Sequence, residues 1–75
     1  TIRFGLKEAG EISLAIYNIK GQKVVTLKKG FYNPGNYSAI WKGVDHSGKP
    51  AASGVYFVRL KTPNEEKTRK LILLK

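Results

Sequence analysis

Turn signals recur along this chain so often that they leave little room for a helix. They are short groups built around Gly, Pro, Asn and Asp, residues that readily adopt or initiate turns. The groups are Ala9-Gly10, Lys20-Gly21, Lys29-Gly30, Asn33-Pro34-Gly35, Asp45-His46-Ser47-Gly48 and Thr62-Pro63-Asn64. The segments between them have the length of strands, so the sequence predicts an all-β chain without helices.

Apolar and polar side chains alternate in three of these segments. A period of two places one set of side chains on a buried face of a strand and the other set in water. The apolar sets are Ile12-Leu14-Ile16, Tyr37-Ala39-Trp41 and Tyr56-Val58-Leu60. We therefore expect half-buried strands, with Tyr37, Trp41 and Tyr56 largely buried in a core.

The predicted strands follow one another closely. We expect them at residues 1–6, 11–18, 23–27, 36–42, 54–61 and 67–74, with residues 31–32 as a short seventh. Between them, Pro34-Gly35 fits the centre of a type II turn, and Asp45 and Gly48 fit the ends of a type I turn. Six to seven short antiparallel strands joined in this way predict a small β-sandwich with Greek-key connections.

Length and charge limit the organisation and the partners. The 75 residues suffice for one hydrophobic core, so we expect a single domain over residues 1–75. There are 14 Lys and Arg against 5 Asp and Glu, a net charge of +9. The basic residues are scattered, with one tight group at Lys67, Arg69 and Lys70, and they form no basic stripe. We expect no nucleic-acid partner, whereas weak binding of an anionic glycan fits the charge.

No group of residues predicts catalysis, a metal or a cofactor. The chain has no Cys and a single His, His46, so it offers neither a thiolate nor a multi-histidine metal site. Asp45, His46 and Ser47 are consecutive, and consecutive side chains cannot align as a proton-relay triad. Glu65 and Glu66 follow a turn signal at a predicted hairpin tip, where neither burial nor a partner would make one a general acid. We expect a protein that is not an enzyme.

The segment Lys70 to Lys75 differs from the other predicted strands. Leu71, Ile72, Leu73 and Leu74 are consecutive, so the strand is apolar on both faces, and Lys70 and Lys75 bracket it. A strand at the edge of a sandwich needs only one apolar face, which leaves the second available to a partner. No stretch approaches the roughly 18 apolar residues of a membrane span, so we expect no transmembrane segment.

Five segments, taken in order, resemble a known family. They are Tyr17 to Val24, Pro34-Gly35-Asn36-Tyr37 with Trp41-Lys42-Gly43, Asp45 to Gly48, Ser53 to Leu60, and Thr68 to Lys75. Together they resemble the type A C-terminal sorting domain of the type IX secretion system and its relative, the immunoglobulin-like domain of flagellar hook-capping proteins. The resemblance covers nearly the whole chain and implies an immunoglobulin-like sandwich.

The resemblance to sorting domains also implies a function and partners. A domain of this kind directs a secreted bacterial cargo protein, attached N-terminal to it, across the outer membrane and to the cell surface. Its partners are outer-membrane components of the secretion system and anionic lipopolysaccharide. The sorting and recognition segment maps onto Lys70, Leu71, Ile72, Leu73, Leu74 and Lys75. Further family-motif positions map onto Pro34, Gly35, Tyr37, Trp41, Gly54, Tyr56 and Leu60, residues that a sandwich also uses for its fold.

Two other functions stay open at this point. The relationship to hook-capping proteins favours a structural accessory or assembly domain, and the charge favours a binding module for an anionic glycan. All three interpretations describe a protein without a catalytic site.

Overall fold

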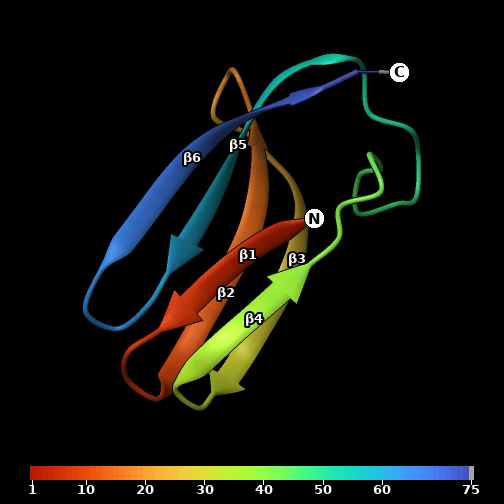
Figure 1. The fold of residues 1–75 in the computed structure, drawn as a ribbon. Helices are drawn as coiled ribbons and strands as arrows, with labels where there is room; N and C mark the ends of the chain where they lie inside the picture. The colour runs from red at the N-terminus through yellow and green to blue at the C-terminus, as the bar shows by residue number, and fades with distance from the viewer. Residues whose placement is uncertain (75) are drawn as a thin grey trace.

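The structure is a computed structural model that describes residues 1–74 and contains two antiparallel sheets (Figure 1). No helix occurs in the described part of the chain. The strands are β1 (Ile2–Leu6), β2 (Gly10–Asn18), β3 (Lys23–Tyr32), β4 (Gly35–Ala39), β5 (Gly54–Lys61) and β6 (Glu66–Leu73). The all-β antiparallel sandwich expected from the turn signals is confirmed.

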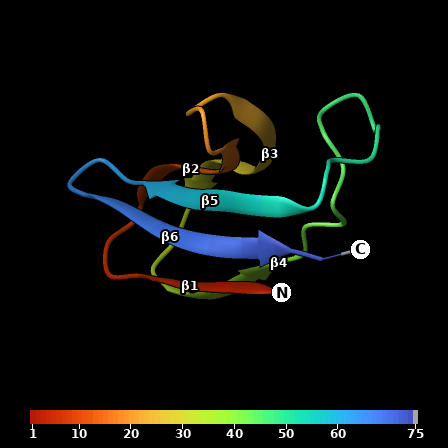
Figure 2. The ribbon, with the colours of Figure 1, turned by 90° about the horizontal axis from the view of Figure 1, so that it is seen from above.

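The two sheets differ in size. β1 and β4 form a two-stranded sheet, and the other strands form a four-stranded sheet in the order β3-β2-β5-β6. The chain crosses between the sheets after β1, β3 and β4, so that β5 returns to lie beside β2. Seen from above in Figure 2, β1 lies next to β6, and the small sheet covers one face of the large one. β3 and β6 are the edge strands of the large sheet.

The core lies between the two sheets. From the large sheet come Leu14 and Ile16, which are almost completely inaccessible to water, and Val58 and Leu60, which are also buried. The small sheet closes the core with Leu6 and Ala39. Because strand side chains alternate between faces, these positions recur at every second residue of β2 and β5. The alternation read from the sequence is confirmed in both strands.

Strand β3 is longer than expected. Its alternation is interrupted because the pairing with β2 shifts register twice, between Leu14 and Ala15 and between Ile16 and Tyr17. A β-bulge of this kind sets two residues against one and breaks the period of two. The expected strand at 23–27 therefore continues through Gly30, and residues 31–32 form its end instead of a separate seventh strand.

Strand β4 is shorter than expected, and its first turn is of a different type. It ends at Ala39, so Trp41 lies in the connection to β5 and is only partly buried, as is Tyr37. Gly35 has a φ of 152°, whereas the third residue of a type II turn has a φ near +80°. Gly35 thus begins β4 with a positive φ, a backbone conformation that favours glycine.

Candidate functional site

Strand β6 carries the segment that the sequence singled out, and it has one unpaired edge. It pairs with β5 over its whole length, from Lys61 opposite Glu66 to Gly54 opposite Leu73. No other described strand is hydrogen-bonded to its second edge. The backbone N–H and C=O groups of that edge can accept an additional strand, which makes β6 a candidate interaction element.

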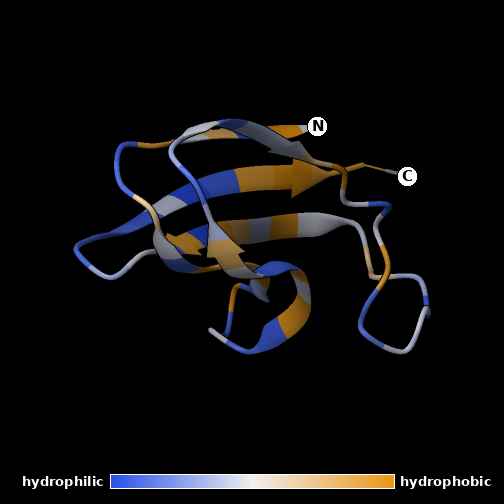
Figure 3. Ribbon diagram, turned by 90° about the horizontal axis from the view of Figure 1, so that it is seen from below, coloured by the Kyte–Doolittle hydropathy of each residue, from blue (hydrophilic) through white to orange (hydrophobic). Residues whose placement is uncertain are grey.

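The structure divides the Lys70 to Lys75 segment between two faces. Leu71 and Leu73 point inward and pack against the core. Ile72 lies on the opposite face and is 60% exposed, and Leu74 is 83% exposed. In Figure 3 the same strand changes from hydrophilic along its first part to hydrophobic at its end. Lys75 lies outside the described residues, and recognition of this segment by a secretion system stays a prediction.

An apolar patch surrounds Ile72 on the outer face of the large sheet. The pairing places Ile72 opposite Val55, while Phe57, the next outward residue of β5, lies opposite Tyr17 of β2. We call Tyr17, Val55, Phe57 and Ile72 the outer patch. The Arg59 guanidinium lies 4.5 Å from the centre of the Tyr17 ring, a cation–π contact at the margin of the patch. Sequence reasoning missed Tyr17 and Phe57, although the alternation that buries Ile16 and Tyr56 turns these neighbours outward.

Lys70 adds a second cation to the outer patch. It lies opposite Phe57 in the pairing of β5 with β6 and is exposed. Arg59 contacts Glu66 as well, with 3.5 Å between Nε and Oε1, and both side chains are close to half exposed. An exposed ion pair of this kind contributes little to stability. The outer patch therefore has an apolar centre and a mostly basic margin.

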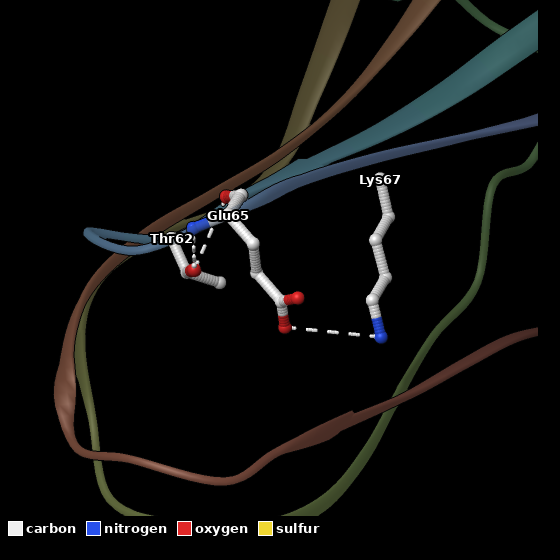
Figure 4. Close-up of polar contacts among 3 residues, drawn as sticks. All are labelled: Thr62, Glu65 and Lys67. Carbon is white, nitrogen blue, oxygen red and sulfur yellow. Dashed lines mark hydrogen bonds and ion pairs between the residues drawn. The ribbon is translucent and has the colours of Figure 1, made fainter.

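The hairpin between β5 and β6 is fixed by Thr62 and Glu65 (Figure 4). The Thr62 hydroxyl oxygen accepts from the backbone N–H of Glu65 at 3.0 Å, and the Thr62 backbone N–H donates to Glu65 O at 2.8 Å. The Glu65 carboxylate lies 3.8 Å from Lys67 Nζ, with both side chains more than half exposed. Glu65 and Glu66 are exposed, as expected for a hairpin tip. Each forms an ion pair with a basic residue of the large sheet, Glu65 with Lys67 and Glu66 with Arg59.

The family-motif positions form two separate groups. Tyr37 stacks on Phe4, with 5.6 Å between ring centroids, and its hydroxyl donates to Asn33 O. At the other group, Trp41 packs edge-on against Tyr56 at 5.0 Å, and Trp41 Nε1 donates to Val44 O at 2.8 Å. Gly35 and Pro34 belong to the first group, Gly54 to the second, and Leu60 is buried in the core. None of these positions contributes to the outer patch.

The Asp45–Gly48 turn is built around one carboxylate. The Gly48 N–H donates to Asp45 O at 2.9 Å, as a type I turn requires, and Asp45 Oδ1 accepts from Ser47 N at 2.9 Å and Lys49 N at 3.0 Å. The Lys49 N–H bond is the main cause that holds the pKa of Asp45 below its usual value; partial burial opposes it, and the Ser47 N–H bond adds to it. The His46 N–H donates to Val24 O and ties the turn to β3.

Residues 1–74 contain neither a cluster of metal-ligating side chains nor a membrane-spanning helix. Within residues 1–74, no group of three His, Asp or Glu side chains is placed to hold a metal ion. The same residues contain no helix long and apolar enough to cross a membrane.

A protein-family model matches most of the chain. The family model described as the FlgD Ig-like domain matches residues 2–66, which include five complete strands and the first residue of β6. Neither a curated protein nor a solved structure is significantly similar to the chain.

Proposed function

The chain belongs to the FlgD Ig-like domain family, and we propose that it is a non-catalytic accessory domain that packs against a neighbouring protein domain in a larger assembly. The observation that carries the proposal is the outer patch, an apolar area on the sheet face opposite the core, where Ile72 is exposed and Tyr17, Val55 and Phe57 are only partly buried. The hook-capping half of the family resemblance, a structural domain, agrees with the family match.

The composition of the outer patch suits a protein interface. Interfaces combine an apolar and aromatic centre with a polar margin, and Tyr and Arg are enriched in them. Here Phe57 and Ile72 supply the centre, and Arg59 and Lys70 supply the margin. An uncovered face of an antiparallel sheet normally carries polar side chains. A large apolar side chain that is 60% exposed, Ile72, therefore favours a contact.

The absence of Cys from the chain provides a direct test. Ile72→Cys places a single thiol at the centre of the outer patch, and Ser47→Cys places a matched thiol in the exposed Asp45–Gly48 turn. Labelling rates are compared, by mass spectrometry of the peptide concerned, between the isolated chain and the whole gene product that contains it. We expect slower labelling at Ile72→Cys in the whole product, by about tenfold or more, and equal rates at Ser47→Cys. Equal rates at both positions would contradict the proposal.

A second candidate function is a C-terminal sorting and anchoring domain for type IX secretion. One observation favours it: the Lys70 to Lys75 segment that the sorting resemblance singles out includes the end of an edge strand with exposed Ile72 and Leu74. In this function the segment would be recognised by outer-membrane components of the secretion system. The cargo would then be linked to anionic lipopolysaccharide at the cell surface.

An export assay separates the two functions. A reporter followed by residues 1–75 is expressed in a host with type IX secretion, alongside the same fusion with Lys70→Glu. The accessory function predicts that neither fusion reaches the cell surface. The sorting function predicts surface display of the first fusion and a reduced level of the second. Lys70 is exposed, and such a surface change usually alters stability by less than about 0.5 kcal/mol. Circular dichroism would verify that both fusions fold.

A further inference from the structure

The two sheets do not close against each other between β1 and β6. A cleft opens there, and its floor is formed by the buried core residues Leu14, Val58 and Leu60. Its two sides come from β1 and β6, which lie next to each other in Figure 2. The cleft has a volume of about 80 Å³, enough for a side chain but not for a folded partner. It differs from the outer patch, which lies on the other face of the large sheet.

Inward-facing cations line this cleft. The pairing of β5 with β6 sets Lys67 opposite Leu60 and Arg69 opposite Val58, so both cations lie on the same face as the core. Arg3 of β1 lines the cleft as well. All three residues are exposed, and none of the residues that line the cleft is acidic. The nearest acid with a defined contact is Glu65, which lies 3.8 Å from Lys67 in an exposed ion pair.

Both sides of the cleft are unpaired strand edges. β1 pairs only with β4, and β6 pairs only with β5, among the strands of the described chain. The free backbone groups of such an edge accept an extended peptide, while side-chain pockets give specificity. The cleft thus offers three complementary features: backbone hydrogen-bonding groups, an apolar floor and a cationic rim.

We propose that the cleft between β1 and β6 binds an extended acidic segment of a partner protein, which adds to the edge of β6 and places one apolar side chain on Leu14, Val58 and Leu60. Charge selects this occupant. Inward-pointing charges on an edge strand prevent indiscriminate pairing, and here they repel a second copy of a chain with a net charge of +9. The same cations attract an acidic segment.

The test uses a short synthetic peptide that alternates glutamate with valine and is blocked at both ends. Its binding to the chain is followed by NMR titration. We expect shifts of the backbone amides in β6 from Lys67 to Leu71 and in β1 from Arg3 to Gly5, and an affinity that falls with added salt. Shifts confined to the outer patch, or no binding, would overturn the proposal.

Two double variants separate the cleft from the overall charge. Lys67→Glu with Arg69→Glu reverses two cations inside the cleft. Lys20→Glu with Lys42→Glu makes the same change in net charge on exposed residues outside it. We expect the first to weaken peptide binding by at least about tenfold and the second by less than about threefold. Equal losses in two folded variants would show non-specific attraction and would overturn the proposal.

A modified peptide tests the backbone pairing. Methylation of alternate backbone nitrogens, prepared in both registers, keeps the side chains and charge but blocks hydrogen bonding to a strand edge. We expect at least one register to lose binding. Undiminished binding in both registers would contradict strand addition.

The last experiment measures binding of the chain to phosphatidylglycerol vesicles. If the chain binds the vesicles and not the peptide, and the Lys67→Glu, Arg69→Glu variant abolishes vesicle binding, the site recognises lipid and the proposal is wrong. None of these outcomes bears on the protection of Ile72→Cys, which tests the accessory function.

Discussion

Tyr56 donates its hydroxyl hydrogen to the backbone carbonyl of Ala52 at 2.6 Å, across the glycine that begins β5. Tyr37 makes the equivalent bond to Asn33 O at 2.5 Å, across the glycine that begins β4. Each tyrosine follows its glycine by two residues, and Gly35 and Gly54 share a φ of 152°. The same Gly-x-Tyr corner therefore starts one strand in each sheet. A tyrosine that bonds back to the preceding connection is a known stabilising feature of immunoglobulin-like sandwiches.

The two corners should contribute differently to stability. Tyr56→Phe removes a hydrogen bond at a buried ring and leaves Ala52 O without this partner, so we expect a loss of about 1 to 2 kcal/mol. Tyr37→Phe removes a more exposed bond, whose groups water can satisfy, and should cost less than about 1 kcal/mol. Denaturant unfolding followed by the fluorescence of Trp41, the single Trp, measures both. A larger loss for Tyr37→Phe would contradict this ranking.

Gly54 should be difficult to replace although there is space around it. A Cβ atom built at this position would meet nothing within 4 Å, so the cost of Gly54→Ala comes from the backbone alone. The φ of 152° lies in a region that is almost confined to glycine, and we expect a loss of about 1 to 3 kcal/mol. Ser53→Ala, at the adjacent exposed position, is the control and should change stability little. Equal midpoints for the two variants in thermal unfolding would show that the backbone relaxes.

Sequence reasoning succeeded where one short-range pattern determines the structure. β5 was predicted at its observed bounds, because the alternating residues from Tyr56 to Leu60 follow a glycine and precede a turn signal. β3 was predicted too short, because its bulges depend on the twist of the pairing with β2, which no local pattern records. Trp41 continues the alternation of Tyr37 and Ala39, yet the strand ends before it.

The candidate surfaces were predictable only in part. Alternation counted back from Leu71 and Leu73 places Lys67 and Arg69 on the inner face of β6. Whether β1 covers these cations depends on where the small sheet lies over the large one, and this is a tertiary property. The exposure of Ile72 followed from the apolar run itself. The assembly of Tyr17, Val55 and Phe57 around it required the strand order β2-β5-β6.

Trp41 stabilises the connection between β4 and β5 from outside the strands. Its ring packs on Tyr56, and its Nε1 donates to Val44 O. Trp41→Ala removes both contacts, and because the ring is only partly buried we expect a loss of about 3 kcal/mol, the lower end for a large aromatic side chain. Trp41→Phe keeps much of the ring contact and should lose about 1 kcal/mol with the hydrogen bond. Unfolding followed by circular dichroism compares them, and an unchanged midpoint for Trp41→Ala would contradict a structural role.

The Asp45 carboxylate should make the stability of the fold depend on pH in the acid range. Its pKa is lower in the folded chain than the usual value of 3.8, mainly because the Lys49 N–H donates to it. A lowered folded-state pKa means that the ionised carboxylate stabilises the fold. This contribution is present above the unfolded pKa and is lost as the pH falls through the folded pKa. Wild type should therefore exceed Asp45→Asn in stability at neutral pH.

The amide of Asp45→Asn can still accept hydrogen bonds but carries no charge, so the advantage of wild type should shrink once the pH falls below about 4. Thermal unfolding of both proteins at a series of pH values between about 7 and 2 measures the difference. Ser47→Ala is the control, because the bond from Ser47 to Asp45 Oδ1 uses the backbone N–H and survives the change. Its difference from wild type should not depend on pH. A constant difference between wild type and Asp45→Asn over the whole series would show that the charge of Asp45 does not stabilise the turn.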